Sequence, residues 1–526
     1  YPKLGNMSDT PDPVSPWRES EILLEASRAY LNPYRDVNVW AEFTHSSGRL
    51  RIRRPAFWDG GNRWRIRFAS PVAEGTWKWI SFSDAHDSGL DGMTGEIHCQ
   101  PPELTEENPF YTHGFWRIPK GGRNLVYADG TPALICADTI WAFPWRATVA
   151  EAREYAKNRR ERGFNAGLFM SVQPDMRCTG PQDREKERGF DVGFDDLPEG
   201  HLNKLRPDYF QYLDQLVDIL VEHGIAPVWQ PVFHGYGWKG LTTAGPIVTP
   251  EEYARYCRYL VARYGARPAL YLVSGDGPGT YLSIDAGGRE IEAWDAYAQP
   301  TGNHYYPWGD NDAFQDADWL DFQWCQTGHG GEHLPERVAR MWLNQPPKAV
   351  ANGEPSYEKM GNPNSAANWW QGHEAWSNLC AGGTMGIVYG AGSLWNWRRS
   401  PSEDLPDWTV AKDCSWRDAI AFDGSRYVGH VRRIVESCGV DFSGMAPDQH
   451  CVISRRALLK KYALLMVYVP DGGSVLLTPF ARDWVPRHYR VYDAMTGKMM
   501  KEADWDGNQN PEVPEGRARV VVFTER

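Results

Sequence analysis

The sequence predicts an α/β fold, a (β/α)8 TIM barrel with a β-sandwich domain before it and another after it. Residues 30–100 alternate apolar and polar side chains with the two-residue period of strands, and strand-like segments return after residue 440. Between them, short apolar runs alternate with long helical stripes, as in a barrel of βα units. We therefore expect an N-terminal sandwich at 1–105, a barrel at 106–440 and a C-terminal sandwich at 441–526.

The N-terminal strands show the alternation most clearly. Trp64, Ile66 and Phe68 are separated by two arginines, and residues 59–62 form a turn signal before them. Such alternation is typical of an antiparallel sheet with one face in the core. Residues 101–122, rich in proline, glutamate and glycine, read as the connector to the barrel.

The barrel segment begins with a predicted hairpin that turns at Asp129-Gly130. Thr148 and Glu151 then form a capping box for a long helix that ends at Gly163. Continuing this alternation of strands and helices gives eight expected strands. They lie near residues 133–136, 166–170, 226–230, 270–273, 296–300, 319–323, 348–351 and 385–389.

Helical periodicity stops after about residue 440. The remaining segments alternate like strands, with a turn signal at residues 493–497. We expect a small β-sandwich there, with strands at 462–469, 474–477, 488–492 and 517–523.

Composition limits the classes of partner. The net charge of −12, without a basic run, argues against a nucleic-acid partner. No apolar stretch approaches the roughly 18 residues of a membrane span. Nine cysteines without a CxxC pair favour a reducing compartment, so we expect a cytoplasmic protein, or a periplasmic or secreted one if a leader preceded Tyr1. The sequence does not indicate an oligomeric state.

The usual metal and cofactor motifs are missing. No HExxH and no Cys/His ligand spacing occurs, so we predict no metal. Residues 235–240 match GxGxxG after a strand, but no helix follows to hold a pyrophosphate, and we interpret them as a loop without a cofactor. No GxSxG nucleophile motif occurs either.

Two short stretches, residues 271–279 and 348–356, indicate the chemistry. In each, an apolar run breaks into glycine, an acid and proline, which places Asp276 after the fourth strand and Glu354 after the seventh. The C-terminal strand ends form the active face of a barrel, so the two carboxylates can flank one glycosidic bond. Taken singly, each acid is more often a turn or loop residue than a catalytic one, and it is their positions after strands four and seven together that favour catalysis. The sequence leaves retaining and inverting hydrolysis open.

Other expected strand ends carry polar and aromatic side chains suited to a sugar. Each is more often structural than functional, but the set describes a polar mouth with aromatic walls. The 25 tryptophans of the chain have two explanations, burial in a large β-rich core or the lining of such a cleft. The predicted substrate-binding residues are Asp138, Trp141, Gln173, Gln230, His234, Tyr236, His304, Trp324, Trp395 and Trp397, with Asp175 beside Gln173. We expect a carbohydrate substrate.

Several stretches resemble glycoside hydrolase family 140, the apiosidase-type enzymes, over nearly the whole chain. Residues 56–60, 65–68 and 74–77 are similar to the sandwich that precedes these barrels, and residues 133–141 and 162–165 to the start of the barrel. Residues 441–526 resemble the C-terminal sandwich that bears a collagen-binding label in this group, from which we infer no collagen binding.

The resemblance implies a retaining mechanism, with Asp276 as acid/base and Glu354 as nucleophile. Many barrel glycosidases have Asn-Glu after strand four, whereas this sequence has Gly275-Asp276, as in the apiosidase-type subset. We expect an exo-acting hydrolase that releases a terminal furanosyl residue, β-D-apiose being the leading candidate, from plant glycans or glycosides. The alternatives are a barrel glycosidase for an arabinofuranoside or a glucoside, and a carbohydrate-binding protein without catalysis.

Overall fold

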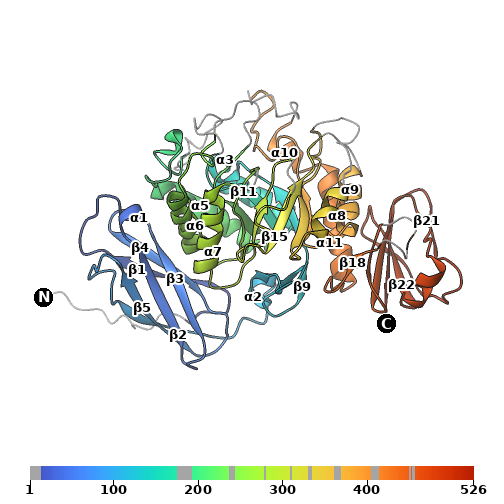
Figure 1. Ribbon diagram of the computed structural model, residues 1–526, viewed down its shortest axis with the longest axis horizontal. Coiled ribbons are helices and arrows are strands. Elements are labelled where there is room, and N and C mark those ends of the chain that lie inside the picture. The colour runs from blue at the N-terminus through green and yellow to red at the C-terminus, as the bar shows by residue number, and fades with distance from the viewer. Residues whose placement is uncertain are drawn as a thin grey trace.

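The computed structural model describes residues 13–173, 192–235, 243–277, 280–307, 311–329, 335–360, 369–403, 414–448, 452 and 456–525. Figure 1 shows an N-terminal β domain, a central barrel and a C-terminal β domain along the long axis. The predicted fold class is confirmed, since an eight-stranded parallel sheet lies between antiparallel sheets at both ends.

The N-terminal domain consists of six antiparallel strands. They are β1 (Glu19–Glu25), β2 (Val39–His45), β3 (Arg51–Trp58), β4 (Arg63–Ala69), β5 (Thr76–Ser83) and β6 (Thr94–His98), with the short helix α1 (Pro33–Asp36). β3 changes partners along its length: residues 51–55 pair with β2 and residues 56–58 with β4. It thereby joins two half-sheets around an apolar core in which Phe43 stacks on Phe68 at 4.2 Å.

A small three-stranded sheet connects this domain to the barrel. It contains β7 (Trp116–Arg117), β8 (Leu125–Tyr127) and β9 (Pro132–Ala133), preceded by α2 (Pro109–Thr112). β8 and β9 pair antiparallel, and Gly130 at the turn between them has a φ of 90°. The hairpin predicted at Asp129-Gly130 is therefore confirmed.

Eight parallel strands form the barrel, each hydrogen-bonded to its sequence neighbour, with the last returning to the first. The seam between the seventh and eighth is joined by a hydrogen bond from Met385 N–H to Val350 O of 3.2 Å. The strands are β10 (Ile135–Thr139), β11 (Ala166–Met170), β12 (Ala226–Gln230), β13 (Leu270–Leu272), β14 (Thr301–His304), β15 (Phe322–Gln326), β16 (Ala349–Glu354) and β17 (Gly386–Tyr389).

Helices surround the barrel strands in Figure 1. The helix α4 begins at the predicted capping box of Thr148 and Glu151 and ends at Gly163, whose φ is 91°. The helices are α3 (Phe143–Arg146), α4 (Val149–Arg162), α5 (Pro207–Glu222), α6 (Pro250–Tyr264), α7 (Leu282–Trp294), α8 (Pro335–Leu343), α9 (Trp370–Cys380), α10 (Trp416–Ala419) and α11 (Asp423–Ser437).

The fifth and sixth strands lie later in the chain than predicted. The expected 296–300 is apolar because Tyr297 packs against Trp17 and Phe115 of the N-terminal region, and the strand itself begins at Thr301. Trp319 in the expected 319–323 packs instead on α7, where its Nε1 donates to Asp285 Oδ1 at 2.9 Å. In both places, apolar side chains that pack between elements gave the sequence the pattern of a buried strand.

The C-terminal domain is built around a six-stranded antiparallel sheet. In sheet order its strands are β18 (Ala446–Pro447), β19 (Ala457–Lys460), β20 (Leu464–Val469), β25 (Arg519–Thr524), β22 (His488–Asp493) and β23 (Met499–Asp504), beside the pair β21 (Gly473–Ser474) and β24 (Glu512–Val513). Alternate residues face opposite ways: Val467 and Val521 enter the domain's own core, whereas Met466 and Val522 join the core of the barrel.

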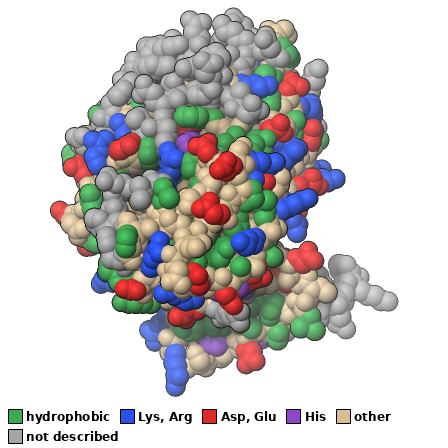
Figure 2. All heavy atoms as spheres, turned by 90° about the vertical axis from the view of Figure 1, so that its right-hand side faces the viewer, with side chains coloured by type: hydrophobic (Ala, Val, Ile, Leu, Met, Phe, Trp, Pro, Cys, Tyr) green, Lys and Arg blue, Asp and Glu red, His purple; other side chains and the backbone are tan. Residues whose placement is uncertain are grey.

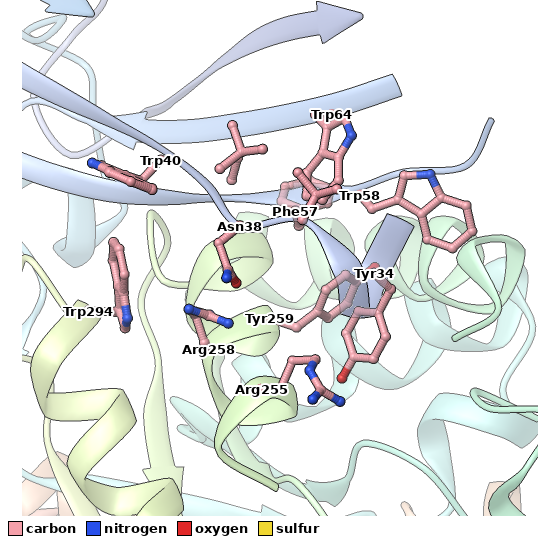
Figure 3. Close-up of a pocket in the computed structure, with 13 residues that line it drawn as sticks. Tyr34, Asn38, Trp40, Phe57, Trp58, Trp64, Arg255, Arg258, Tyr259 and Trp294 are labelled. Atoms are coloured by element: carbon pink, nitrogen blue, oxygen red, sulfur yellow. The ribbon is translucent and has the colours of Figure 1, made fainter. Parts of the chain in front are cut away.

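The N-terminal domain packs on the flank of the barrel. Arg67 of β4 and Arg263 of α6 each lie 2.7 Å from Asp214 of α5, all three at this interface. A crevice beside this network is lined by side chains of both domains, with Trp40 of β2 facing Trp294 of α7 across it (Figure 3). It lies against helices α6 and α7 and away from the C-terminal strand ends.

Figure 2 shows the molecule from the side of the C-terminal domain, with acidic and basic side chains intermingled over this face. Among the described residues, none of the helices combines the length and apolar character needed to cross a bilayer.

Candidate active site

The two predicted acids lie at the C-terminal ends of the barrel strands. Asp276 follows β13 and Glu354 is the last residue of β16. Both are almost completely enclosed, with 6% and 5% of their surface exposed. The C-terminal ends of parallel barrel strands share one face, so the topology brings these distant residues together.

The loop that carries Asp276 is held on both sides. Backbone bridges at Gly275 and Gly277 tie it to the segments that follow β12 and β14. Asp276 itself has a φ of 51°, in the left-handed region that aspartate tolerates better than most residues. A Cβ at Gly275 would approach Gln230 Oε1 to 2.7 Å, so glycine before the acid permits close packing against β12.

Each carboxylate contacts one polar side chain of the sixth strand or of the loop after it. Gln326 Nε2 donates to Asp276 Oδ1 at 2.8 Å and also to the carbonyl of Tyr305 at 2.9 Å. His329 Nε2 lies 3.0 Å from Glu354 Oε1. The two acids are therefore supported by different side chains from one segment.

His304 lies between the two acids. Its Nδ1 is 3.8 Å from Asp276 Oδ1 and its Nε2 is 3.6 Å from Glu354 Oε2. One ligating atom from each of the three residues lies within 4.8 Å of the other two, which brings a carboxylate oxygen of Asp276 within 4.8 Å of one of Glu354. The acids are close enough to act on the same bond.

Burial disfavours charge throughout this cluster. It raises the pKa of Asp276 well above its ordinary value, and the negative charge of Glu354 adds to the rise. Burial also raises the pKa of Glu354 to about 8, although the hydrogen-bonding side chain of Tyr357 acts in the opposite direction. It lowers the pKa of His304 to about 3 and that of His329 to about 4, so both imidazoles are neutral near pH 7.

Residues 119–440, more than half of the chain, match the family of apiosidase-like catalytic domains. The chain belongs to the apiosidase-like family. Residues 13–84 match a domain of unknown function, DUF5060. Within the matched catalytic domain lie the whole barrel and both acids, and the chain is a glycoside hydrolase.

Solved structures resemble this apiosidase-like chain over most of its length. A candidate glycoside hydrolase from Bacteroides vulgatus ATCC 8482 is 17% identical, with a TM-score of 0.70 over 98% of this chain and 100% of its own. A glycoside hydrolase of family 5 from the same organism is 20% identical, with a TM-score of 0.63 over 79% and 94%. At these identities the likeness shows the fold. No curated protein matches the chain.

Several predicted binding residues of the apiosidase-like barrel lie around the acid pair. Gln230, the last residue of β12, has its Oε1 3.3 Å from His304 Nδ1. Trp141 meets His304 edge-on at 6.4 Å, and Trp395 meets Trp141 edge-on at 6.1 Å. The structure thus brings Gln230, His304, Trp141 and Trp395 into one group with the acids.

Two further predicted residues are buried near strand ends. Gln173 follows β11 with 5% of its surface exposed. His234 follows β12, where its ring stacks on Tyr281 at 5.7 Å and its backbone N–H donates to Gly275 O, so it supports the loop of Asp276. Tyr236 and Asp175 lie outside the described residues.

Three predicted binding residues lie elsewhere. Asp138 is inside β10, not after it, and points to the helical layer, where its Oδ2 is 2.5 Å from Arg159 Nε of α4. Trp324 is enclosed within β15, a layer below Gln326. Trp397 stacks on Trp416 of α10 at 4.5 Å and is fully buried. Each fills the interior instead of the mouth.

Gln326, His329 and Tyr357 reach the acid pair although the sequence analysis did not select them. A sixth strand placed at its observed position, 322–326, would have ended at Gln326 and identified it as a mouth residue. His329 and Tyr357 lie in loops beyond β15 and β16, where neither periodicity nor spacing indicates which side chain turns inward.

The same cluster could hold a cation. Asp276, His304 and Glu354 offer two oxygens and one nitrogen at a spacing that a divalent metal can bridge. A metal there would occupy both carboxylates that hydrolysis needs, one as a free acid and one as a nucleophile. We therefore interpret the short distance between Asp276 and Glu354 as that of a catalytic acid pair and not of a metal site. The absence of a catalytic metal remains a prediction.

Proposed function

We propose that the chain is a retaining exo-glycoside hydrolase of the family 140 type, which releases a terminal furanosyl residue, β-D-apiose in first place, from plant glycans or glycosides. The separation of the acids carries this proposal. Retaining hydrolysis needs carboxyl groups about 5–5.5 Å apart, whereas inverting hydrolysis needs about 6.5–9.5 Å to admit a water. Oxygens of Asp276 and Glu354 within 4.8 Å of one another favour the retaining class.

The two acids take different roles in this proposal. Glu354 attacks the anomeric carbon as the glycosidic bond breaks, and Asp276 protonates the departing oxygen. Asp276 then removes a proton from water, which displaces Glu354 and releases the sugar. The raised pKa of Asp276 suits it to hold a proton until the leaving group needs it.

The enclosure of the site supports an exo mode and a sugar ligand. Both acids are about 95% covered, so a chain end fits more easily than the middle of a polymer. Trp141 and Trp395 supply flat apolar faces near polar groups, a combination suited to a sugar ring. The family description and the short aspartate at the acid position favour a furanoside such as apiose.

The test is release of free apiose from an apiose-bearing plant oligosaccharide by the wild type, beside Glu354→Gln and Asp276→Asn. Glu354→Gln should be inactive on every substrate. Asp276→Asn should lose hydrolysis of the oligosaccharide but keep formation of the glycosyl-enzyme from an aryl glycoside whose leaving group needs no proton. Wild-type turnover by Glu354→Gln would overturn the assignment, and release of arabinose or glucose alone would change the sugar.

A further inference from the structure

The two oxygens of Glu354 have different surroundings. Oε1 lies 3.0 Å from His329 Nε2, whereas Oε2 has no hydrogen-bond partner among the described residues. Oε2 lies 3.6 Å from Nε2 of His304, whose Nδ1 in turn lies 3.8 Å from Asp276 Oδ1. The carboxylate is therefore held by one oxygen, and the other faces the cluster where the scissile bond would lie.

The hydrogen on His329 can be placed from its second contact. The backbone N–H of Tyr357 donates to His329 Nδ1 at 3.2 Å, and on this contact we assign Nδ1 as the acceptor nitrogen. A neutral imidazole carries its single hydrogen on the other nitrogen, Nε2, which donates to Glu354 Oε1. Burial lowers the pKa of the imidazole to about 4, against an opposing hydrogen bond to the backbone of Pro355, and so keeps the ring neutral.

The loop after the nucleophile itself fixes this ring. Tyr357 lies three residues beyond Glu354, and its ring packs against His329 with centroids 4.1 Å apart. His329 is thus clamped between the backbone of that loop and the carboxylate, with 18% of its side chain exposed. A donor held in this way costs little reorganisation during the reaction.

On this basis we propose that His329 is a positioning residue that holds Glu354 Oε1 and so selects Oε2 as the attacking atom. The inference rests on the proposed retaining mechanism. Oε2 forms the bond to the anomeric carbon while the glycosidic C–O bond breaks, its electron pair leaving with the oxygen that takes the proton of Asp276. Oε1 becomes the carbonyl oxygen of the ester and keeps the hydrogen bond from His329. In the second step water adds at the anomeric carbon, gives its proton to Asp276, and Oε2 leaves as carboxylate.

The other groups that face Glu354 do not offer the same contact. Asp276 has its pKa raised by the charge of Glu354 and hydrogen-bonds to Gln326, and His304 is on the Oε2 side, where its Nε2 is 3.6 Å away. Tyr357 contributes its backbone to His329, and its side chain lowers the pKa of Glu354, but the Tyr357 hydroxyl is not within full hydrogen-bond geometry of either carboxylate oxygen. His329 is the group within hydrogen-bond distance of Oε1 among the described residues.

The test compares His329→Ala and His329→Gln with wild type and with His373→Ala. His373 is a matched control because it is a partly buried histidine whose Nδ1 contacts Tyr468 Oη at 2.7 Å, away from the acids. We expect His329→Ala to lower kcat/KM on an aryl glycoside about 10- to 100-fold and to raise the pKa of its acidic limb by about one unit, because the donor to the ionised carboxylate is lost. The kcat/KM of His329→Gln, whose side chain can still donate a hydrogen bond, should lie between those of His329→Ala and wild type. The kcat/KM of His373→Ala should match that of wild type.

A second readout does not depend on turnover. The carboxyl carbon of Glu354 can be titrated by ¹³C NMR, its signal identified by its loss in Glu354→Gln. An upward shift of its pKa in His329→Ala supports the contact, and an unchanged titration in a folded variant overturns the proposal. If the titration shifts but wild type hydrolyses no glycoside, the proposed function fails and the assignment of Oε2 as the attacking atom fails with it.

Discussion

Asp276 and Glu354 must differ in protonation state for the proposed reaction. Retaining hydrolysis needs one carboxylic acid and one carboxylate, yet burial raises the pKa of both. Because each negative charge disfavours ionisation of the other, such a pair holds a single proton over a wide pH range. The hydrogen bonds from Gln326 to Asp276 and from His329 to Glu354 are the local contacts that bias where this proton lies.

The acid pair could be predicted from the sequence, but the side chains that support it could not. Asp276 and Glu354 follow apolar runs that break into glycine and proline, and strand ends of a barrel meet on one face. His329 approaches Glu354 because of the conformation of a loop, and a loop has no hydrophobic periodicity from which the direction of a side chain could be predicted. Asp138 was predicted to follow a strand and to line the mouth. The strand continues to residue 139, so the Asp138 side chain faces Arg159 instead.

Glu374 of α9 carries a prediction about pH. It is buried below the loop of the nucleophile, its Oε2 accepts from Ser356 N–H at 3.1 Å, and burial raises its pKa to about 8. A raised carboxyl pKa stabilises the fold at low pH, and this contribution is lost as pH rises through the folded pKa. Glu374→Gln cannot ionise, so the free energy of unfolding of this variant, relative to that of wild type, should rise by roughly 4 kcal/mol between pH 5 and pH 9.

Urea unfolding at both pH values measures this difference. The matched control is Glu161→Gln, an exposed glutamate at the end of α4, which should keep the wild-type dependence on pH. An equal difference between Glu374→Gln and wild type at pH 5 and pH 9 would show that Glu374 is already ionised in the fold.

At the scale of elements, polar strands were the hardest to locate. β14 reads Thr-Gly-Asn-His, and its inward side chains serve the site instead of an apolar core, so it lacks the run that marks a strand. The neighbouring Tyr297 and Trp319 are apolar because they pack between elements. Strands such as β11 and β12, which contain only buried residues, were found at their observed bounds.

The interface network of Asp214 gives a second prediction. Although its burial would raise the pKa, the charges of Arg263 and Arg67 hold the pKa of Asp214 below its ordinary value. This contribution to stability is present above the unfolded pKa of about 3.9 and is lost as pH falls through the folded pKa. Asp214→Asn should lower the free energy of unfolding by about 2–3 kcal/mol at pH 7, because two buried arginines each lose one carboxylate partner, while Arg67 keeps Glu21 and Arg263 keeps Asp59.

Asp218→Asn is the matched control on the same helix. Its side chain is 49% exposed and pairs with Arg267, so its removal should cost less than about 1 kcal/mol. Denaturant unfolding at pH 7 and below pH 4 checks both variants, and the gap between Asp214→Asn and wild type should narrow in acid. A gap that stays constant with pH would mean that the ion pairs are not its source.

At the scale of the molecule, the C-terminal sheet is a structural part of the barrel. Residues of β20 on one face complete the barrel core, and Tyr468 stacks on Trp376 of α9 with centroids 6.0 Å apart. The alternation that predicted a sheet in this region does not say what covers its second face. What covers the second face is seen only in the structure, where α9 and α11 pack against it.

Met466→Asp tests this coupling. Met466 is fully buried toward the barrel, whereas Met499 of β23 is 53% exposed and serves as the control Met499→Asp. A charge at residue 466 should lower the free energy of unfolding by more than about 3 kcal/mol, and that at residue 499 by less than about 0.5. Thermal unfolding followed by tryptophan fluorescence measures both. Equal midpoints for the two variants would show that the C-terminal sheet does not support the barrel.

The most direct test of the acid pair is the stereochemistry of transfer to methanol, read by ¹H NMR of the methyl glycoside formed from a β-apioside. Methanol fixes the anomeric centre, which would otherwise equilibrate in the free sugar. Asp276 and Glu354 with oxygens within 4.8 Å of one another predict the β-methyl glycoside, by two displacements through Glu354. The α-methyl glycoside would contradict the account, because it requires a single displacement and room between the acids for the attacking alcohol.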